Sequence, residues 1–247
     1  MLTLVRPITP YIISVHLVTR ITGMVQCEGL RKGSQYPFSA DDTSVMMGVD
    51  LKFTDDGFAI LTMNNGENRI STPYIRQLQK ALDEVERNDN CKALLTTGEG
   101  KFFCNGIDLE WLKTANKEQF FQAIQDLYWR FMYFSLPTVA MINGHAFGAG
   151  ANIALAHDYR VMRNDRGWFS LNEVRINVQV KPETIQLIRI TGPEAKDLGI
   201  VDVTTDISSL EKSAKNLANL ALGPTGIDRD MLQKMKQDIY PRITSNL

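Results

Sequence analysis

Histidine and cysteine are scarce in this sequence of 247 residues, which contains three of each. The cysteines, Cys27, Cys91 and Cys104, form no Cys-x-x-Cys pair and have no spacing typical of a disulfide framework. The three histidines are also scattered, which argues against a histidine-rich metal site. We therefore expect no bound metal and a reducing compartment.

An excess of charge of either sign is absent as well. The sequence has 27 lysines and arginines against 28 aspartates and glutamates, a net charge of −1, and no cluster of basic residues. Because nucleic-acid-binding domains usually carry a basic patch, we expect no nucleic-acid partner. The longest apolar run of the N-terminal region, YIISVHLV (11–18), is too short to cross a bilayer, so we expect no membrane span.

The two ends of the chain point to different compartments. Residues 1–27 contain arginine and hydroxyl side chains but no acid, as in a mitochondrial transit peptide, although a disordered extension explains this composition equally well. The last three residues, Ser-Asn-Leu (245–247), resemble the peroxisomal Ser-Lys-Leu address without its basic residue. We predict a peroxisomal protein, with the mitochondrion as the alternative, and a poorly ordered extension over residues 1–47.

Strand and helix patterns alternate along the rest of the chain. The segment at 49–65 predicts two short strands about a turn, and the segment at 71–89 predicts a helix with Thr72 as its N-cap. The other predicted elements are a buried strand at 92–98, a helix at about 116–135, strands at 138–146 and 159–162, and a helical region at about 183–247. This order predicts an α/β fold with largely parallel inner strands.

Two glycine-containing loops each follow a predicted inner strand, where ligands bind in α/β folds. One is EGKFFCNGIDLEWL (99–112), and the other is FGAGANIALAHDYR (147–160), in which small residues open an apolar helix. Main-chain N–H groups exposed in both loops can converge as an oxyanion hole. Close packing of helix against strand is the alternative explanation for the glycines. The spacing fits neither a dinucleotide-binding GxGxxG motif nor a P-loop.

Three longer motifs occur in order: GEGKFFCNGIDLEWL (98–112), MINGHAFGAGANIALAHDYRVM (141–162) and FSLNEVRI (169–176). Together they resemble the crotonase (enoyl-CoA hydratase/isomerase) superfamily. The resemblance implies a crotonase-like core, a spiral of ββα units, over residues 48–190. It also implies a C-terminal helical region over residues 191–247 that is shorter than in typical members.

The resemblance also implies how substrate is bound. The implied substrate-binding positions are Cys104, Asn105, Gly106, Asp108, Gly148 and Asn152. The main-chain N–H groups of Ile107 and Ala149 are implied to hold the oxygen of an acyl-CoA thioester. We interpret Asp108 as the cap of the following helix rather than a reacting group. Coenzyme A is then part of the substrate, and no separate cofactor is expected.

Hydratases of this superfamily use two glutamates to handle water. This sequence has Asn152 at the first position and Glu173 at the second, in the context SLNEV, which resembles the Δ3,Δ2-enoyl-CoA isomerases of peroxisomal type. One carboxylate suffices to remove a proton from C2 of a 3-enoyl-CoA and to return one at C4. We therefore expect Glu173 to be the catalytic acid/base, with a pKa raised by burial.

Two other functions stay open. Hydratase or thioesterase chemistry is known on the same scaffold. A non-catalytic acyl-CoA-binding protein is the third hypothesis, because the stretch between Arg189 and Gly199 is shorter than in the family by about one helix. That region supports trimers in the family, so the resemblance implies a homo-oligomer. Because the region is shortened here, whether the oligomer is a trimer stays open.

Overall fold

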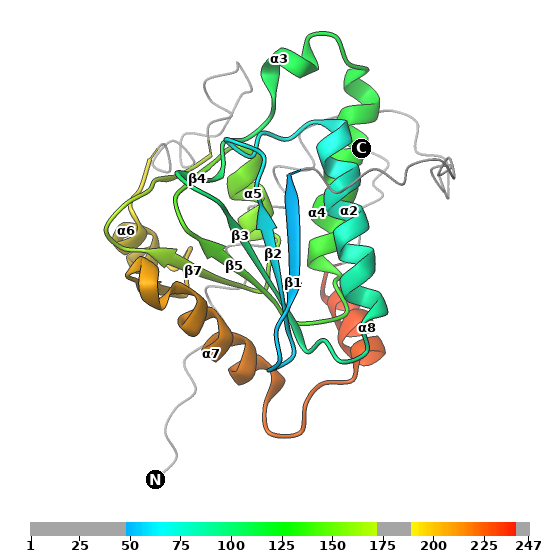
Figure 1. The fold of residues 1–247 in the computed structure, drawn as a ribbon, viewed down its shortest axis with the longest axis vertical. Coiled ribbons are helices and arrows are strands. Elements are labelled where there is room, and N and C mark those ends of the chain that lie inside the picture. The colour runs from blue at the N-terminus through cyan, green and yellow to red at the C-terminus, as the bar shows by residue number, and fades with distance from the viewer. Residues whose placement is uncertain (1–47, 172–188, 241–247) are drawn as a thin grey trace.

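Two sheets organise the protein, for which a computed structural model describes residues 48–171 and 189–240. The strands of the larger sheet are β1 (Val49–Phe53), β2 (Phe58–Met63), β3 (Ala93–Gly98), β5 (Thr138–Ile142), β7 (Tyr159–Arg163) and β9 (Val203–Thr205). They lie side by side in the order β1-β2-β3-β5-β7-β9 (Figure 1). Only β1 is antiparallel to its neighbour, so the prediction of parallel inner strands is confirmed.

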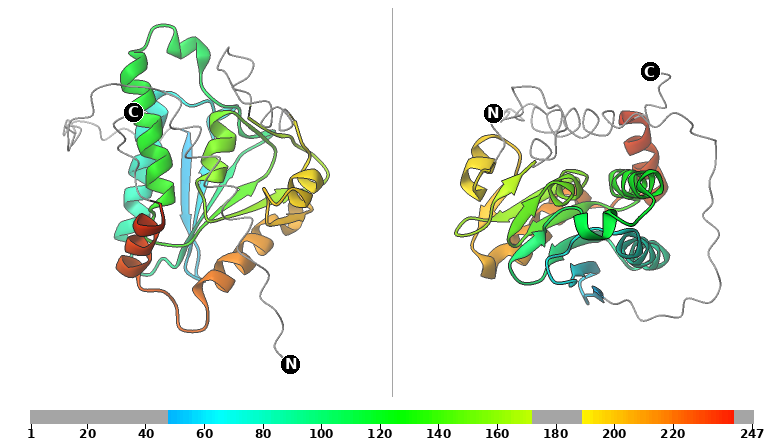
Figure 2. Two further views of the ribbon diagram at one scale, coloured as in Figure 1. Left: turned by 180° about the vertical axis from the view of Figure 1, so that it is seen from behind. Right: turned by 90° about the horizontal axis from the view of Figure 1, so that it is seen from above.

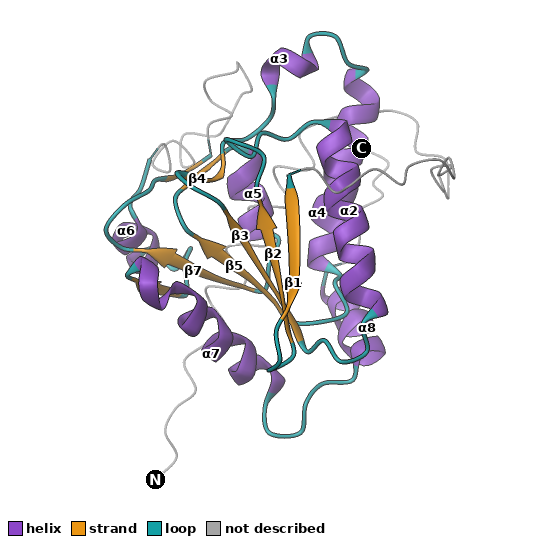
Figure 3. Cartoon of the chain, in the orientation of Figure 1, coloured by secondary structure: helices purple, strands orange, loops and turns teal. Residues whose placement is uncertain are grey.

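The smaller sheet consists of three short parallel strands, β4 (Phe102–Cys104), β6 (His145–Phe147) and β8 (Phe169–Ser170). Each follows a long strand directly in the chain, so that β3 leads to β4, β5 to β6 and β7 to β8. The chain thus steps from the large sheet to the small one three times. Figure 3 shows β4, the first strand of the small sheet, next to the strands of the large one. This repeated step gives the spiral of ββα units that the sequence predicts.

Helices cover both faces of the large sheet. They are α2 (Thr72–Arg87), α3 (Leu109–Leu112), α4 (Lys117–Met132), α5 (Ala149–Leu155), α6 (Gly192–Asp197), α7 (Leu210–Leu222) and α8 (Arg229–Ile239), with a short 3₁₀ turn at Ile207–Ser209. Helices α2 and α4 pack against each other on one side, and α7 lies against β5 and β7 on the other (Figures 1 and 2).

The alternation of side chains along the strands produces two apolar layers. In β3, Leu94 packs into the core beneath α2, α4 and α5, whereas Leu95 faces the opposite way, into the core with α7. Ala214 and Ala218 of α7 are fully buried in that second layer. Because successive strand residues point to opposite faces, an uninterrupted apolar strand is stable only when both faces are covered.

Two predictions at element boundaries are wrong. The N-cap of α2 is Ser71, whose side chain accepts the N–H of Tyr74 at 3.4 Å, and Thr72 is the first helical residue. The apolar segment 138–146 is two strands, β5 and β6, in different sheets. The break falls at Gly144, where a Cβ would lie 2.1 Å from the carbonyl oxygen of Lys101, so only glycine permits this close crossing.

The C-terminal region is not helical throughout. Helices α6, α7 and α8 are present as predicted, but β9 lies among them and extends the large sheet beside β7, with Val203 paired to Val161. The strand has only three residues and ends next to charged ones, so its sequence pattern is too short to distinguish it from a loop.

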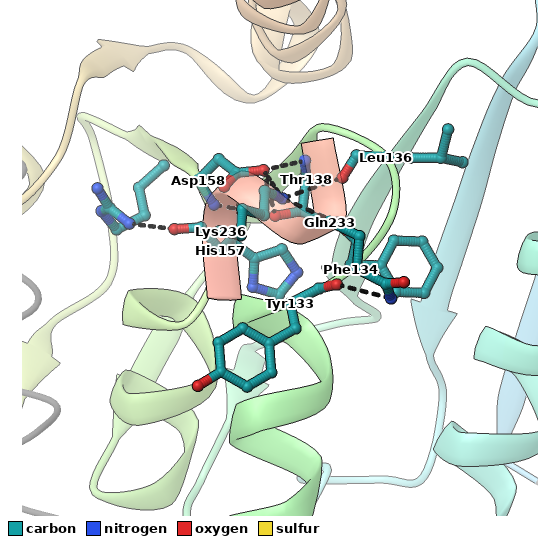
Figure 4. A network of polar contacts seen from close by, with 9 residues as sticks. Tyr133, Phe134, Leu136, Thr138, His157, Asp158, Gln233 and Lys236 are labelled. Carbon is teal, nitrogen blue, oxygen red and sulfur yellow. Dashed lines mark hydrogen bonds and ion pairs between the residues drawn. The ribbon is translucent and has the colours of Figure 1, made fainter. Parts of the chain in front are cut away.

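Helix α8 is anchored at both ends of its inner face. Lys236 is only 5% exposed and donates to the carbonyl oxygens of Phe134 (3.1 Å) and Leu136 (3.2 Å) and to the Asp158 carboxylate (2.7 Å), as Figure 4 shows. Arg229 donates to three main-chain carbonyls, one in the last turn of α2 and two after it, including that of Asn88 at 2.6 Å. These contacts fix α8 against its own chain.

Candidate active site

Two loops leave the same edge of the small sheet. Because β4 and β6 are parallel neighbours, residues 105–108 and the start of α5 both begin at their carboxyl ends. A Cβ placed on Gly106, which has φ +85°, would lie 3.0 Å from the carbonyl oxygen of Phe147 and 3.8 Å from the nitrogen of Ala149. The loops that the sequence singles out are therefore in direct contact.

The orientation of the Ile107 amide follows from its neighbours. Ile70 donates its N–H to Gly106 O at 2.8 Å, and Asp108 donates to Ile70 O at 2.9 Å, which together make a parallel bridge between Ile70 and Ile107. In such a bridge the N–H of the middle residue points away from the partner strand. Among the described residues, no acceptor binds the Ile107 N–H.

Ala149 provides the second amide. It is the first residue of α5, after Gly148, whose φ of +49° turns the chain into the helix. The N–H of Gly148 is used by Ser170 O at 2.9 Å, whereas the N–H of Ala149 meets no acceptor within the described ranges. N–H groups in a first helical turn have no partner in their own helix and lie at its positive end.

The second glycine of the motif has a packing role. A Cβ on Gly150 would lie 2.4 Å from the carbonyl oxygen and 2.6 Å from the Cβ of Cys104. Helix α5 thus sits directly on the end of β4. Close packing therefore explains Gly150, whereas Gly148 allows the turn that precedes the Ala149 amide.

The side chains of the first loop hold its shape. Cys104 is fully buried and donates its thiol to Asn68 O at 2.9 Å, and burial raises the pKa of this thiol to about 12. Asn105 donates its side-chain amide to the Glu67 carboxylate at 2.8 Å, which lowers the pKa of Glu67. Asp108 accepts the Trp111 N–H at 3.0 Å, so it caps α3 as predicted.

Of the two positions that the resemblance singles out for acid/base chemistry, the structure describes only one. Asn152 is buried on α5, one turn after Gly148, whose carbonyl accepts its main-chain N–H at 3.0 Å. Glu173 lies outside the described residues. The chain reaches that region through Leu171, which is 4% exposed and directly follows β8, the neighbour of β6.

The two described histidines are accounted for by packing. His157 is buried, its ring nitrogens lying 2.8 Å from Ile153 O and 2.9 Å from the Thr96 hydroxyl, and the His145 ring packs against Phe102 and Phe147. Within the described part of the chain, no group of three or more metal-ligating side chains is gathered. No helix in these ranges is long and apolar enough to cross a bilayer.

Sequence reasoning missed the segment that supports the first loop. Residues 67–70, called the strap below, run along Cys104–Asp108 and hydrogen-bond to it from both main chain and side chains. Asn68 is fully buried at its centre. A polar asparagine after a strand was the available signal, because asparagine tolerates the left-handed conformation that it adopts here, with φ +55°.

Comparisons with known proteins agree with this arrangement. The family model described as enoyl-CoA hydratase/isomerase matches residues 54–180. "Enoyl-CoA delta isomerase 2, peroxisomal" of Arabidopsis thaliana is 32% identical over 179 residues, covering 62% of this chain and 75% of that protein. "Enoyl-CoA delta isomerase 3" of the same plant is 27% identical over 224 residues, covering 78% and 92%.

Solved structures show the same fold. The human mitochondrial delta3-delta2-enoyl-CoA isomerase superposes with a TM-score of 0.69 at 21% identity, covering 78% of this chain and 84% of that one. An enoyl-CoA hydratase from Bacillus anthracis gives 0.66 at 23% identity, covering 81% and 84%. With its two contacting loops and its spiral of paired strands, the chain belongs to the crotonase, or enoyl-CoA hydratase/isomerase, family.

Proposed function

We propose that this protein is a Δ3,Δ2-enoyl-CoA isomerase, which moves the double bond of a 3-enoyl-CoA to the 2-position during β-oxidation of unsaturated fatty acids. The observation that carries the proposal is the pair of amides at Ile107 and Ala149, on contacting loops and without acceptors in the described ranges. The similarity to plant enoyl-CoA delta isomerases supports the choice of reaction.

The two amides act on the thioester oxygen. When a base removes a proton from C2, the electrons of the C–H bond delocalise into a dienolate, and negative charge develops on that oxygen. Fixed N–H donors stabilise such charge without reorganising, and one donor is typically worth about 2.7–4 kcal/mol. Gly106 lets the two loops approach each other, and Gly148, where a Cβ would meet nothing within 4 Å, leaves space for the thioester.

Glu173 is proposed as the single acid/base. In the sequence it comes two positions after Leu171, which directly follows β8. It takes the proton from C2 and delivers a proton to C4, where the dienolate accepts it, and the double bond then lies between C2 and C3. Asn152 cannot act as the second carboxylate that hydration uses. The proposal therefore favours isomerisation over addition of water.

Binding of the rest of the substrate falls to the first loop. Cys104, Asn105 and Gly106 shape the wall beside the thioester, and Asp108 holds α3 next to it. Trp111 of α3 is only partly buried and packs on the fully buried Phe120, with ring centroids 5.6 Å apart, so Trp111 is available to border the acyl chain. Coenzyme A enters only as part of the substrate.

Turnover with product analysis tests the proposal. Purified protein is incubated with a 3-enoyl-CoA, and 2-enoyl-CoA, 3-hydroxyacyl-CoA and free coenzyme A are quantified by liquid chromatography. We expect 2-enoyl-CoA as the first product. The E173Q variant is the matched control, and it should bind the substrate as the wild type does but form little product. Formation of 3-hydroxyacyl-CoA from a 2-enoyl-CoA supplied in a parallel reaction, without isomerisation of the 3-enoyl-CoA, would instead identify a hydratase. Release of free coenzyme A would identify a thioesterase, and binding of both substrates without any product would identify a non-catalytic protein.

Compartment and assembly are separate parts of the proposal. Relatives named as peroxisomal isomerases favour the peroxisome. A fluorescent fusion of the protein should then co-localise with a peroxisomal marker, and co-localisation with a mitochondrial marker would contradict this part of the proposal. Light scattering on the purified protein tests the homotrimer that the family resemblance implies.

A further inference from the structure

Asn68 combines burial with an unusual backbone conformation. It is fully buried, and its φ of +55° makes it the only residue other than glycine with positive φ in the described ranges. Such a conformation persists only where the surroundings hold it in place, and it is often found at functional sites. Asn68 lies in the middle of the strap, next to the loop that carries Ile107.

The Asn68 side chain uses both ends of its amide. Its Nδ2 donates to the carbonyl oxygens of Phe102 (3.2 Å) and Phe103 (3.1 Å), and its Oδ1 accepts the N–H of Asn65 at 2.8 Å. Its own carbonyl oxygen accepts the Cys104 thiol at 2.9 Å. One residue thus fixes the whole of β4 relative to the strap.

The pairing between the strap and β4 continues into residues 105–108, called the catalytic loop below because they include Ile107. Asn105 donates its N–H to Glu67 O at 3.0 Å, and Ile70 forms the bridge that turns the Ile107 N–H away from the strap. A shift of β4 along the strap would change the direction of the Ile107 N–H. The side chain of Asn68 binds Phe102 and Phe103, and its carbonyl oxygen binds the Cys104 thiol, so this one residue opposes such a shift along all of β4.

We propose that Asn68 is a positioning residue, which acts through β4 and the strap to aim the Ile107 amide at the substrate oxygen. The expected effect of Asn68 on turnover rests on the proposed function, whereas its role in holding β4 against the strap does not. A misplacement of about 1 Å in a catalytic group can cost a factor of about 100 in rate, so the contribution of Asn68 is measurable although it touches no substrate.

The test compares N68G with a matched control, N143A. Glycine adopts positive φ freely, so N68G removes the side-chain hydrogen bonds without straining the backbone. Asn143 is also buried and binds main chain at the other end of β4, with Oδ1 accepting from Gly98 N at 3.0 Å and Nδ2 donating to Gly100 O at 3.2 Å. Both variants lose a comparable buried amide, but only N68G frees the catalytic loop.

We expect kcat of N68G for 3-enoyl-CoA to fall about 10- to 100-fold with KM within about twofold, because the lost interaction acts in the transition state. N143A should keep kcat per folded molecule. N68D keeps the acceptor oxygen but places a carboxylate against the carbonyls of Phe102 and Phe103, so its kcat should fall at least as much as that of N68G. An unchanged kcat in N68G, or an equal loss in N143A, overturns the inference.

A second readout is independent of activity. Alkylation of cysteines is followed by peptide mass spectrometry, with buried Cys91 as the internal control for global unfolding. If Asn68 holds β4, N68G accelerates labelling of Cys104 at least about tenfold while Cys91 stays unchanged, as expected for local opening. Equally faster labelling of both cysteines, or no faster labelling of either, overturns the inference that Asn68 holds β4. If the wild type lacks isomerase activity, the proposed function fails, and this labelling still decides whether Asn68 positions the loop.

Discussion

Replacement of Gly150 by alanine is the sharpest perturbation of the contact between the two loops. The added methyl would lie 2.4 Å from the carbonyl oxygen and 2.6 Å from the Cβ of Cys104. Both are part of a buried strand end, so neither can rotate away as a flexible side chain would. The G150A variant must therefore move α5 away from β4, and Ala149 moves with it.

Two effects of opposite sign decide the change in stability. Alanine favours a helix over glycine by about 0.8–1.0 kcal/mol, whereas overpacking of a tight core costs about 1–3 kcal/mol. Relief of the contact needs a displacement on the order of 1 Å, since ordinary carbon–oxygen contacts exceed 3.4 Å. We expect a net loss of about 1–2 kcal/mol in the free energy of unfolding and a fall of about 100-fold in kcat.

Urea unfolding measures the first quantity and steady-state turnover of a 3-enoyl-CoA the second. Gly100 provides the control because a Cβ there would meet nothing within 4 Å, although its φ, unlike that of the helical Gly150, is positive at +72°. G100A should cost about 1 kcal/mol through backbone strain and leave kcat unchanged. Wild-type kcat in a fully folded G150A protein would refute the link between loop contact and catalysis.

Three further predictions concern stability. Lys236→Met removes the buried partner of Asp158 (Figure 4) and should lower the free energy of unfolding by about 3 kcal/mol in urea titrations; a loss below about 1 kcal/mol would contradict the anchoring of α8. Burial lowers the pKa of His157 to about 4 from a usual 6.5, so protonation favours the unfolded chain and stability falls as pH drops from 6.5 to 4. This loss amounts to about 3 kcal/mol by pH 4, and His157→Gln should remove it in unfolding curves measured across that range. Asp108→Ala should cost about 1 kcal/mol as a lost helix cap, with Asn at 108 restoring it; a 100-fold loss of kcat in both variants would show that the carboxylate reacts.

The sequence predicts well where local chemistry determines the backbone. The turn between β1 and β2, the amphipathic helix α2 and the buried strand β3 follow from side-chain pattern and turn residues, and all three are present. The start of α5 at Ala149 and the cap at Asp108 were likewise readable, because small residues and a capping carboxylate have specific backbone effects.

What the sequence does not reveal depends on contacts between distant segments. The division of residues 138–146 between two sheets requires the approach of Gly144 to Lys101, 43 residues earlier. The role of Asn68 depends on hydrogen bonds to residues 34 and 35 positions away. Periodicity reports only which face of an element is apolar, so neither contact leaves a mark in the local pattern.

The role of Glu173 as the one proton carrier is tested most directly with a 3-enoyl-CoA deuterated at C2. We predict that the wild-type protein converts this substrate to 2-enoyl-CoA more slowly than the undeuterated compound. We also predict that E173Q is at least about 100-fold slower than the wild type at equal substrate binding, since a general base contributes that much or more. Conversion by E173Q at the wild-type rate would contradict the proposed chemistry.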